Sequence, residues 1–529
     1  MNQQTIGKYR WTICALLFFA TTVNYLDRQV LSLLKPDLET EFGWTKSDYA
    51  NITSVFQLVY AISMLFAGRF IDKLGTKKGY VWAIVIWSLG AIIHALALPM
   101  GEKVCAILGF TGMGLTFFSV VGFMISRAVL AVGEAGNFPA AIKATAEWFP
   151  KKERSFATGI FNSGANVGAI LAPLTVPWIF EKWGNRWEPA FILIGAVGFI
   201  WIIFWIKFYN QPEKQKNLSK SELEYIQDGD KENLSSQDTV QSEKKTSWIT
   251  LLGYKQTWAF AVGKFMTDGV WWFFLFWLPA YLSDQYGMKP TQQMLPLAVL
   301  YTITMFGSVG GGWFPVYFLK KGHEIYEARM KAMLMIAFIP LVILAAQPFG
   351  EISYWVPVLL IGIGAAAHQA WSANLFTTVS DMFPKKATAS VIGIGGMLGG
   401  LGGVIISKTG GWLFDSKTQE GISKAWESGK NAGMSDYLNK LQQTSFTDKT
   451  GKVIDVVHKD LFHADSAFQH KLMKIDSVQT VQFIQSQKQT IMEAMSPAYT
   501  TMFTICALAY LIAWLIMKSL VPKMKKIEL

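Results

Sequence analysis

Long apolar segments alternate with short polar segments along most of this chain. Each apolar run holds about 20 residues, the length that an α-helix needs to cross the hydrocarbon core of a bilayer, and roughly twelve such runs can be placed. The expected spans are 11–34, 49–71, 79–99, 115–147, 154–180, 187–208, 256–283, 293–319, 330–349, 352–383, 388–413 and 498–520. The pattern therefore predicts an all-α membrane protein with about twelve transmembrane helices.

A polar segment over residues 209–250 interrupts this alternation. It is rich in Ser and charged residues, which is typical of a linker. It separates an N-terminal half, 1–208, from a C-terminal half, 251–529, each with about six spans. The apolar stretch around the fourth span is longer than one helix needs, so residues 104–116 are expected to form a short extra helix or a re-entrant segment.

A second polar segment, residues 414–496, precedes the last span. A connection of this length seldom lacks structure of its own. Apolar residues recur at helical spacing between Asp465 and Met495, which predicts an exposed amphipathic helix within this insertion.

Basic clusters fall on one side of the alternating path, at the ends of apolar runs. Lys and Arg are enriched in cytoplasmic loops, so both termini and the 209–250 linker are expected in the cytoplasm and the 414–496 insertion outside, with the protein in the inner membrane. The residues are Lys8, Arg10, Arg69, Lys73, Lys77, Lys78, Lys151, Lys152, Arg154, Lys320, Lys321, Arg329, Lys331, Lys385, Lys386, Lys523, Lys525 and Lys526. The formal charge of +11 thus reflects topology, and no nucleic-acid partner is expected.

Composition agrees with a membrane protein, because 51% of the residues are hydrophobic and only 16% are charged. The three cysteines lie in apolar runs without metal or redox spacing, so no disulfide framework is implied. No phosphate-cradling loop, metal motif or catalytic triad is evident, and we expect neither a cofactor nor an enzymatic activity.

Four ionised side chains lie inside predicted spans: Asp27 and Arg28 in the first, Arg127 and Glu134 in the fourth. A charge at the bilayer midplane costs roughly 2.5–3.5 kcal/mol on insertion scales, so such residues mark functional sites. Arg127 and Glu134 are two helical turns apart, about 10 Å along the axis, and share a face. An alternative is that each pair, Asp27 with Arg28 and Arg127 with Glu134, is a structural salt bridge.

The run GRFIDKLGTKKGY, residues 68–80, closes the second span and opens the third. It resembles the loop signature of the major facilitator superfamily. The resemblance implies that Gly68 allows close helix approach and that Gly75 makes the turn. It also implies that Asp72 pairs with Arg69 across the cytoplasmic gate. The cations implied to anchor at lipid phosphates are Lys77 and Lys78.

Three further runs narrow the resemblance: NYLDR, SRAVLAVGEAGNFPAAIKATAEWFPKKERS and AHQAWSANLFTTVSDMFP. They are similar to the anion:cation symporters, in particular those for hexuronates and related sugar acids. This implies the major facilitator fold, with twelve helices in two six-helix halves, and proton-coupled uptake of a small organic anion. The resemblance does not extend to residues 104–116, 209–250 or 414–496.

In this interpretation Arg28 and Arg127 attract the carboxylate of the substrate, whereas Asp27 and Glu134 carry the protons. Further polar side chains could bind sugar hydroxyls or could instead join neighbouring helices by hydrogen bonds. They are Tyr25, Gln57, Tyr60, Asn162, Asn166, His368, Gln369, Ser372 and Asn374.

Other polar and aromatic residues leave two interpretations open. Lys264 and Asp268, four residues apart in the seventh span, could form a structural pair. Trp271, Trp272 and Trp277 could form a stacking floor or an interfacial belt.

Glycines recur in the fifth span, residues 164–168, and in the eleventh, residues 393–403. These are corresponding positions of the two halves, so we expect both sets to allow close packing between the halves.

The sequence thus predicts a secondary transporter whose partners are a small anionic substrate, protons and membrane lipid, and which works as a monomer. An exporter or exchanger of another anion, such as a dicarboxylate or a phosphorylated compound, is the alternative within transport. A membrane-embedded enzyme would need a reactive constellation that the sequence lacks. A sensor would use residues 414–496 as its outer binding domain and would bind its ligand without moving it.

Overall fold

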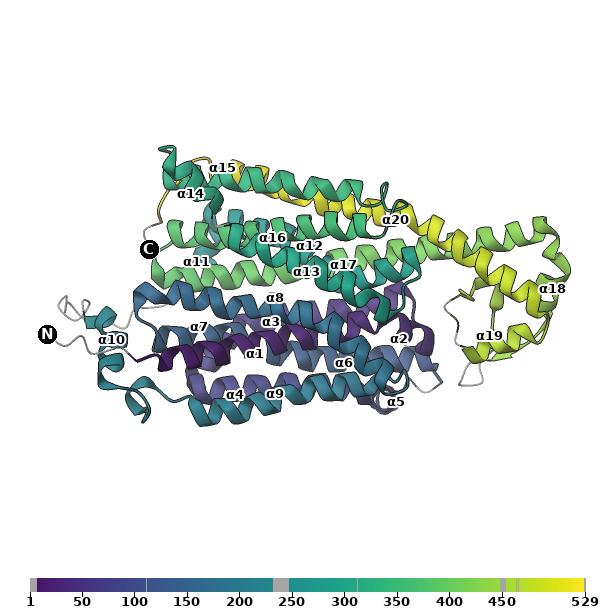
Figure 1. Ribbon diagram of the computed structural model, residues 1–529, viewed down its shortest axis with the longest axis horizontal. Coiled ribbons are helices and arrows are strands. Elements are labelled where there is room, and N and C mark those ends of the chain that lie inside the picture. Colours follow the sequence, from purple (N-terminus) through teal and green to yellow (C-terminus); the bar gives the residue numbers. More distant parts are fainter. Residues whose placement is uncertain are drawn as a thin grey trace.

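The computed structural model describes residues 7–110, 112–231, 247–311, 313–447, 453–462, 464 and 466–527. Long helices lie side by side along one axis and form a bundle (Figure 1). A smaller helical part projects from one end of the bundle; it consists of the described residues within 414–496, and we call it the lobe. Helix α1 begins and helix α20 ends at the opposite end of the bundle.

The described residues of the N-terminal half, 1–208, form six long helices and three shorter ones. The long helices are α1 (Tyr9–Leu33), α3 (Lys46–Leu74), α4 (Thr76–Ile93), α6 (Leu115–Glu134), α8 (Lys151–Lys182) and α9 (Glu188–Phe208). The shorter helices are α2 (Lys35–Phe42), α5 (Ala97–Ile107) and α7 (Asn137–Trp148), and a 3-10 turn, η1 (His94–Leu96), joins α4 to α5. Helix α3 begins with a capping box, in which the Thr45 hydroxyl and the Asp48 carboxylate each accept a backbone N–H.

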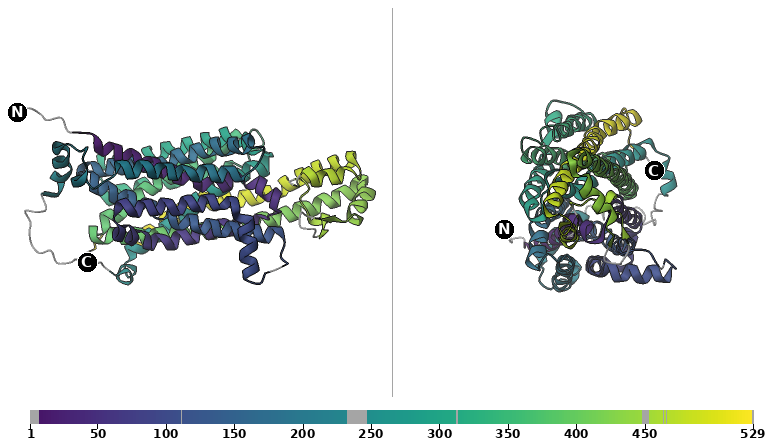
Figure 2. Two further views of the ribbon diagram at one scale, coloured as in Figure 1. Left: turned by 90° about the horizontal axis from the view of Figure 1, so that it is seen from below. Right: turned by 90° about the vertical axis from the view of Figure 1, so that its right-hand side faces the viewer.

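The connection between the halves contains η2 (Pro212–Lys214), α10 (Lys220–Lys231) and α11 (Trp248–Leu252). The C-terminal half contains α12 (Lys255–Tyr286), α13 (Pro290–Gly310), α14 (Trp313–Lys320), α15 (Ile325–Phe338), η3 (Ile339–Ala345), α16 (Trp355–Met382), α17 (Lys385–Gly429) and α20 (Ser477–Leu520). The end-on view in Figure 2 shows the helices of both halves gathered into one bundle.

Among the described residues, ten helices are long and apolar enough to cross a membrane. Helices α1 and α12 have 25 and 32 residues and complete the twelve expected spans, although the ten do not include them. Both helices bury charged residues, among them Arg28 and Lys264, which lower their apolarity. The predicted all-α membrane fold is confirmed.

The structure resolves the ambiguous region around the fourth span. The chain from Ala97 to Ile107 is helix α5, so the extra helix begins earlier than expected and ends within residues 104–116. The predicted span 115–147 consists of two helices, because α6 ends at Glu134 and α7 begins at Asn137. Glu134 therefore lies at the end of α6, next to this break.

The two halves meet along α3 with α17 and along α8 with α13. Glycines of α17 make the first contact close: a Cβ on Gly400 would lie 2.6 Å from Ala61 Cβ, and one on Gly411 would lie 2.4 Å from Ala50 Cβ. The expectation for the eleventh span, residues 393–403, is thus confirmed at Gly400, whereas Gly399 and Gly402 of the same range pack against α12 in their own half. Gly411 lies beyond the predicted range. For the fifth span it is wrong, because Gly164 and Gly168 pack against the backbone of α1, within their own half.

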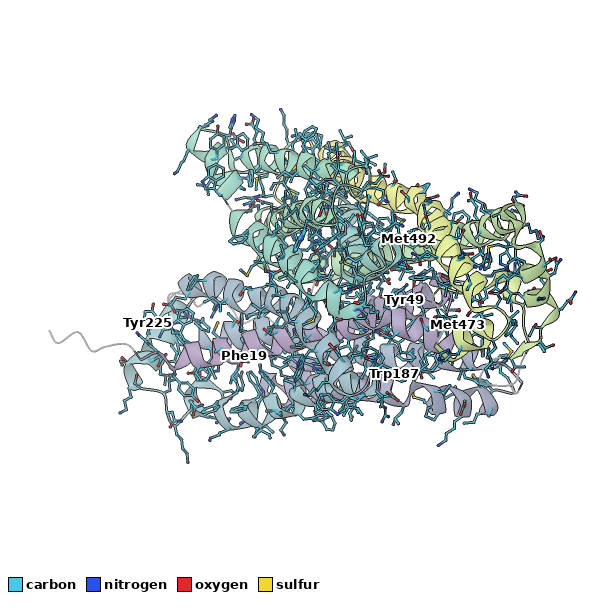
Figure 3. All side chains as sticks on the ribbon, turned by 45° about the vertical axis from the view of Figure 1, so that its right-hand side comes forward. Phe19, Tyr49, Trp187, Tyr225, Met473 and Met492 are labelled. Atoms are coloured by element: carbon cyan, nitrogen blue, oxygen red, sulfur yellow. The ribbon has the colours of Figure 1, made fainter. Side chains whose placement is uncertain are left out.

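The lobe is built on extensions of the last two long helices. Helix α17 runs unbroken to Gly429, and α20 runs unbroken from Ser477 into the last span. Between them lie η4 (Lys430–Met434), α18 (Ser435–Gln443), the antiparallel strands β1 (Phe446–Thr447) and β2 (Val453–Ile454), η5 (Val456–His458) and α19 (Ser466–Met473). Figure 3 shows Met473 and Met492 at this end of the molecule and Tyr225 at the other.

The lobe has a small apolar core of its own. Phe483 is fully buried and contacts the Trp426 ring edge to face, with 5.3 Å between the centroids. The hydroxyls of Tyr437 and Thr480 form a hydrogen bond of 2.6 Å. The predicted exposed amphipathic helix is therefore wrong as a single helix, because α19 and α20 divide it. Of its apolar residues, Phe468, Leu472 and Phe483 are buried in the lobe, whereas Val478 and Val481 are exposed.

We predict that Phe483→Ala unfolds the lobe locally and leaves the bundle intact. Loss of a fully buried Phe side chain costs about 3–5 kcal/mol, and the core of the lobe is small. Hydrogen exchange followed by mass spectrometry should show lost protection over α18 and α19. Val481→Ala is the matched control, because Val481 is 51% exposed. Unchanged protection in Phe483→Ala would show that the lobe does not depend on this core.

Candidate functional site

A buried ion pair joins α1 to α6 in the middle of the N-terminal half. The Arg28 guanidinium donates to Glu134 Oε2 through Nη2 at 2.6 Å and through Nε at 2.9 Å. The two side chains are 4% and 0% exposed. Both sequence alternatives paired other residues, Asp27 with Arg28 and Arg127 with Glu134, so the structure corrects the pairing. Adjacent side chains on a helix diverge, which leaves Arg28 free to reach across to α6.

Aromatic rings surround the Arg28 guanidinium. Its central carbon lies 4.7 Å from the ring centre of Tyr25, 5.1 Å from that of Tyr60 and 5.4 Å from that of Phe56. Trp272 of α12, in the other half, lies at 5.1 Å. Such cation–π contacts stabilise a desolvated guanidinium. This aromatic cluster therefore places Arg28 at the boundary between the two halves.

Arg127 is buried and contacts α1 through the backbone. Its Nη1 and Nη2 atoms donate to the Arg28 carbonyl at 3.2 and 3.3 Å. Its Nε has no hydrogen-bond partner within the described residues. Since a buried donor without a partner costs free energy, Arg127 retains a capacity to bind a further acceptor.

Asp27 is buried as well, at 2% exposure. Neither of its carboxylate oxygens has a hydrogen-bond partner among the residues that the structure describes. It interacts electrostatically with Glu134 and Arg127 at longer range. A buried carboxylate without hydrogen bonds is unfavourable when ionised.

Two of the predicted polar residues join the halves directly. Gln57 Nε2 of α3 donates to Ser407 Oγ of α17 at 3.1 Å. Asn166 Nδ2 of α8 donates to Ser308 Oγ of α13 at 3.3 Å, and Ser308 donates to Gln369 Oε1 at 3.4 Å. Both contacts lie along the helix pairs that hold the halves together, so these amides are placed where relative movement of the halves would break them.

The remaining predicted polar residues are His368, Asn374, Asn162 and Ser372. His368 stacks on Trp271 with 5.2 Å between ring centres, and its Nδ1 is 2.9 Å from the Tyr510 hydroxyl. Asn374 donates to the carbonyls of Gly311 and Ala370, which is a structural role. Asn162 is exposed and Ser372 is half-buried.

Phe56 contacts Arg28 but was not among the predicted site residues, and the role of Trp272 was left open by the sequence. Phe56 precedes Tyr60 by one helical turn, so helical spacing from Tyr60 could have indicated it. The sequence allowed Trp272 to belong either to a stacking floor or to an interfacial belt. Its contact with Arg28 supports the stacking floor. Trp277 is fully buried against Tyr49, with 5.2 Å between ring centres, and does not form an interfacial belt.

The loop after α3 has the predicted turn but not the predicted close approach. Gly75 has a φ of 77°, which favours glycine, and ends α3. A Cβ on Gly68 would meet nothing within 4 Å, so the expectation of close approach there is wrong. Asp72 pairs with Lys143 of α7 at 2.9 Å, and Lys77 donates to Asn210 at 2.8 Å. The Asp72–Arg69 pair stays a prediction.

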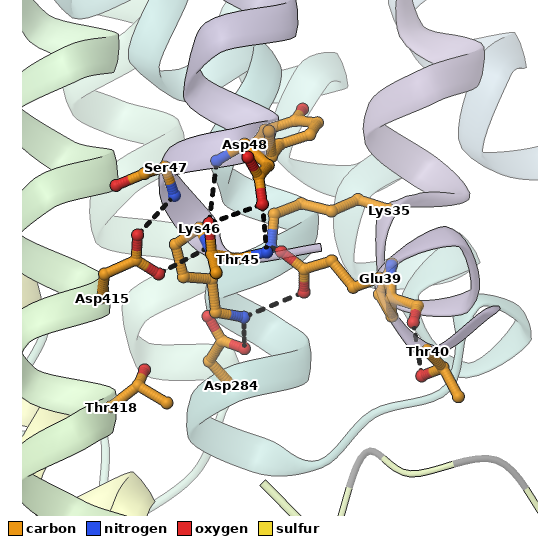
Figure 4. A network of polar contacts seen from close by, with 12 residues as sticks. Lys35, Glu39, Thr40, Thr45, Lys46, Ser47, Asp48, Asp284, Asp415 and Thr418 are labelled. Carbon is orange, nitrogen blue, oxygen red and sulfur yellow. Dashed lines mark hydrogen bonds and ion pairs between the residues drawn. The ribbon is translucent and has the colours of Figure 1, made fainter. Parts of the chain in front are cut away.

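A second polar network links the halves at the end of the bundle next to the lobe (Figure 4). Lys46 Nζ of α3 contacts Glu39 at 3.0 Å and Asp284 of α12 at 2.9 Å. The Asp415 carboxylate of α17 accepts the backbone N–H groups of Lys46 and Ser47 at 2.6 and 2.7 Å. Asp415 therefore caps α3 from the opposite half.

Two helical halves that meet around buried charges are the architecture of a multi-pass membrane transporter. Residues 17–407 match the family described as Major Facilitator Superfamily, and the chain belongs to this family. It is a transporter and not an enzyme.

Curated relatives agree with this assignment. The hexuronate transporter of Escherichia coli strain K12 is 31% identical over 414 residues, which cover 77% of this chain and 88% of the relative. The galacturonate transporter of Dickeya chrysanthemi is 30% identical, covering 59% of this chain and 83% of the relative. The D-galactonate transporter of Escherichia coli O6:H1 is 27% identical, covering 78% and 91%.

Solved structures share the fold. A bacterial homolog of the human lysosomal transporter Spinster, inward-facing and unoccupied, superposes with a TM-score of 0.64 at 17% identity, covering 97% of this chain and 99% of that chain. The xylose transporter XylE from E. coli, inward open, has a TM-score of 0.56 at 13% identity, covering 76% and 89%. At these identities the likeness concerns the fold alone.

Proposed function

We propose that the protein is a proton-coupled symporter that takes up a hexuronate or a related sugar acid by alternating access. The observation that carries the proposal is the buried Arg28–Glu134 pair, with the unpaired carboxylate of Asp27 beside it. The names of the curated relatives, which include hexuronate, galacturonate and D-galactonate transporters, support the substrate class.

The pairing supports a mechanism of coupling. Glu134 is paired with the Arg28 guanidinium, to which a substrate carboxylate would also bind. The Nε of Arg127 is a donor without a partner close by. An arriving carboxylate competes for Arg28 and releases Glu134, which then takes a proton because it is left buried without its cation. Substrate and proton thus favour each other's binding, as symport requires. Asp27 is the second proton site.

Sidedness follows from the basic clusters. In the proposed orientation both termini and the 209–250 linker are cytoplasmic, the lobe is extracytoplasmic and the protein lies in the inner membrane. The network of Lys46, Asp284 and Asp415 then closes the outer end, and it must break for substrate to enter. Because α17 and α20 run unbroken into the lobe, the lobe moves with the C-terminal half.

An exchanger of another organic anion is the alternative within transport, and a sensor is the alternative outside it. Counterflow in proteoliposomes separates a sensor from a transporter, because only a transporter exchanges labelled for unlabelled ligand across the membrane. Uptake of a panel of sugar acids, dicarboxylates and phosphorylated compounds separates the substrate classes.

We predict that Arg28→Lys and Arg127→Lys weaken sugar-acid binding by about 10- to 100-fold, and the corresponding Ala variants more. A charge-assisted hydrogen bond contributes about 1.5–3 kcal/mol, and an ammonium cannot bind a carboxylate bidentately. Isothermal titration of the purified proteins measures the change. Arg186→Lys is the matched control, because that side chain is 69% exposed. Normal affinity in either variant would remove that arginine from the site.

We predict that Glu134→Gln retains counterflow but loses accumulation driven by a pH gradient, because a neutral amide mimics the protonated carboxyl. Asp27→Asn should behave in the same way. Both activities are measured with labelled substrate in the same proteoliposomes, with Glu188→Gln, near the α8–α9 turn, as the control. Accumulation by both neutral variants would place the proton sites elsewhere.

We predict that Asp415→Ala opens the lobe end of the transporter. Loss of a helix cap costs about 1 kcal/mol, roughly a fivefold change in the population. Spin labels on cysteines at Arg186 and Ser416, on opposite halves, report the separation by pulsed electron resonance. Asp436→Ala, at an exposed position of the lobe, is the control. The idea fails if the distance distribution of Asp415→Ala matches that of the control.

A further inference from the structure

An ion pair within α12 is not used by the mechanism above. Lys264 Nζ and Asp268 Oδ2 are 2.6 Å apart, and their side chains are 8% and 17% exposed. The Lys264 ammonium lies 4.5 Å from the ring centre of Phe376 on α16. Asp268 lies against Gly399 of α17, where an added Cβ would come within 2.3 Å of Oδ2. Three helices of the C-terminal half therefore fix this pair.

The pair faces the charged cluster of the N-terminal half. Helices α1 and α12 pack against each other. Trp272, about one turn beyond Asp268, lies over Arg28. Tyr25 contacts the same guanidinium and is close enough to Asp268 to interact with it electrostatically. A molecule whose carboxylate binds Arg28 would thus extend toward Lys264 and Asp268.

The two sides of this interface differ in charge. In the proposed mechanism Asp27 and Glu134 are protonated when substrate is bound, which leaves the cations of Arg28 and Arg127 for one carboxylate. Lys264 and Asp268 together carry no net charge. A lysine donates up to three hydrogen bonds and a carboxylate accepts several, so the pair can both donate to and accept from sugar hydroxyls. A second carboxylate at the same place would meet the Asp268 carboxylate, and like charges in contact disfavour binding.

We propose that Asp268 makes the transporter selective for sugar acids with one carboxylate. It holds Lys264 in a neutral pair that binds the hydroxyl-rich end of the substrate and rejects a second carboxylate. Rejection of the wrong ligand through an opposing charge is a common source of specificity. This inference rests on the proposed function and names the substrate class of the same site.

The test compares D-glucuronate, with one carboxylate, and D-glucarate, with two, in proteoliposomes that contain equal amounts of inserted protein. In Asp268→Asn, Lys264 keeps its charge without an anionic partner. We expect the ratio of kcat/KM for glucarate over glucuronate to rise about tenfold or more, since one like-charge contact is removed. The double variant Lys264→Gln/Asp268→Asn, which has no charge here, should keep only the part of this gain that comes from lost repulsion, because it lacks the Lys264 ammonium that would pair with the second carboxylate.

Two glycine substitutions on α17 test the same role of Asp268 and leave both charges in place. Gly399→Ala places a methyl group against Asp268 and should shift the ratio in the same direction, though less. Gly393→Ala is the matched control, because an added Cβ at Gly393 meets nothing within 4 Å.

An unchanged ratio in both Asp268→Asn and Gly399→Ala, or an equal loss of both substrates, would overturn the selectivity role. So would the loss of pH-driven accumulation with counterflow retained, which would make Asp268 a proton site. Absence of glucuronate counterflow in the wild-type protein would overturn the proposed function as well. Counterflow of glucuronate with an unchanged ratio overturns the selectivity inference alone.

Discussion

The ion pair between Arg28 and Glu134 is the constraint on which the centre of this protein depends. Each charge alone would be costly at membrane depth, and together they tie α1 to α6 with an almost fully desolvated contact. Aromatic rings from α1, α3 and α12 cover the guanidinium. A buried ion pair is a weak stabiliser compared with apolar packing, so the pair fits the proposed exchange of charges at Arg28 better than a purely structural role.

The surroundings of this pair combine tight packing with breakable polar contacts. Glycines of α17 bring its backbone close to α3, because small residues allow helices to pack closely. The bonds between Gln57 and Ser407 and between Asn166 and Ser308 cross the same boundary. Single hydrogen bonds of this kind contribute about 0.5–1.5 kcal/mol each, so the proposed alternating access would have only weak polar contacts to break here.

The lobe illustrates how a long insertion can remain coupled to the membrane bundle. Its two supporting helices are continuations of α17 and α20, so no flexible joint separates it from the C-terminal half. Asp415, at its base, caps the first turn of α3 in the other half. A helix N-terminus presents unpaired N–H groups and a partial positive charge, so a carboxylate there is a favoured partner.

The sequence by itself determined the membrane class, the approximate positions of the spans and the identity of the intramembrane charges, because apolar length and the cost of buried charge are local properties. It also named Tyr25 and Tyr60 as candidate site residues, although their contacts with the Arg28 guanidinium appear only in the structure. It could not determine that Glu134 pairs with Arg28 rather than with Arg127. Nor could it determine that Gly164 faces α1 or that Asn374 donates to the Gly311 carbonyl. These facts depend on how helices far apart in the chain are rotated against one another, and the periodicity of one helix does not contain that rotation. Only the tertiary structure decided which charges meet.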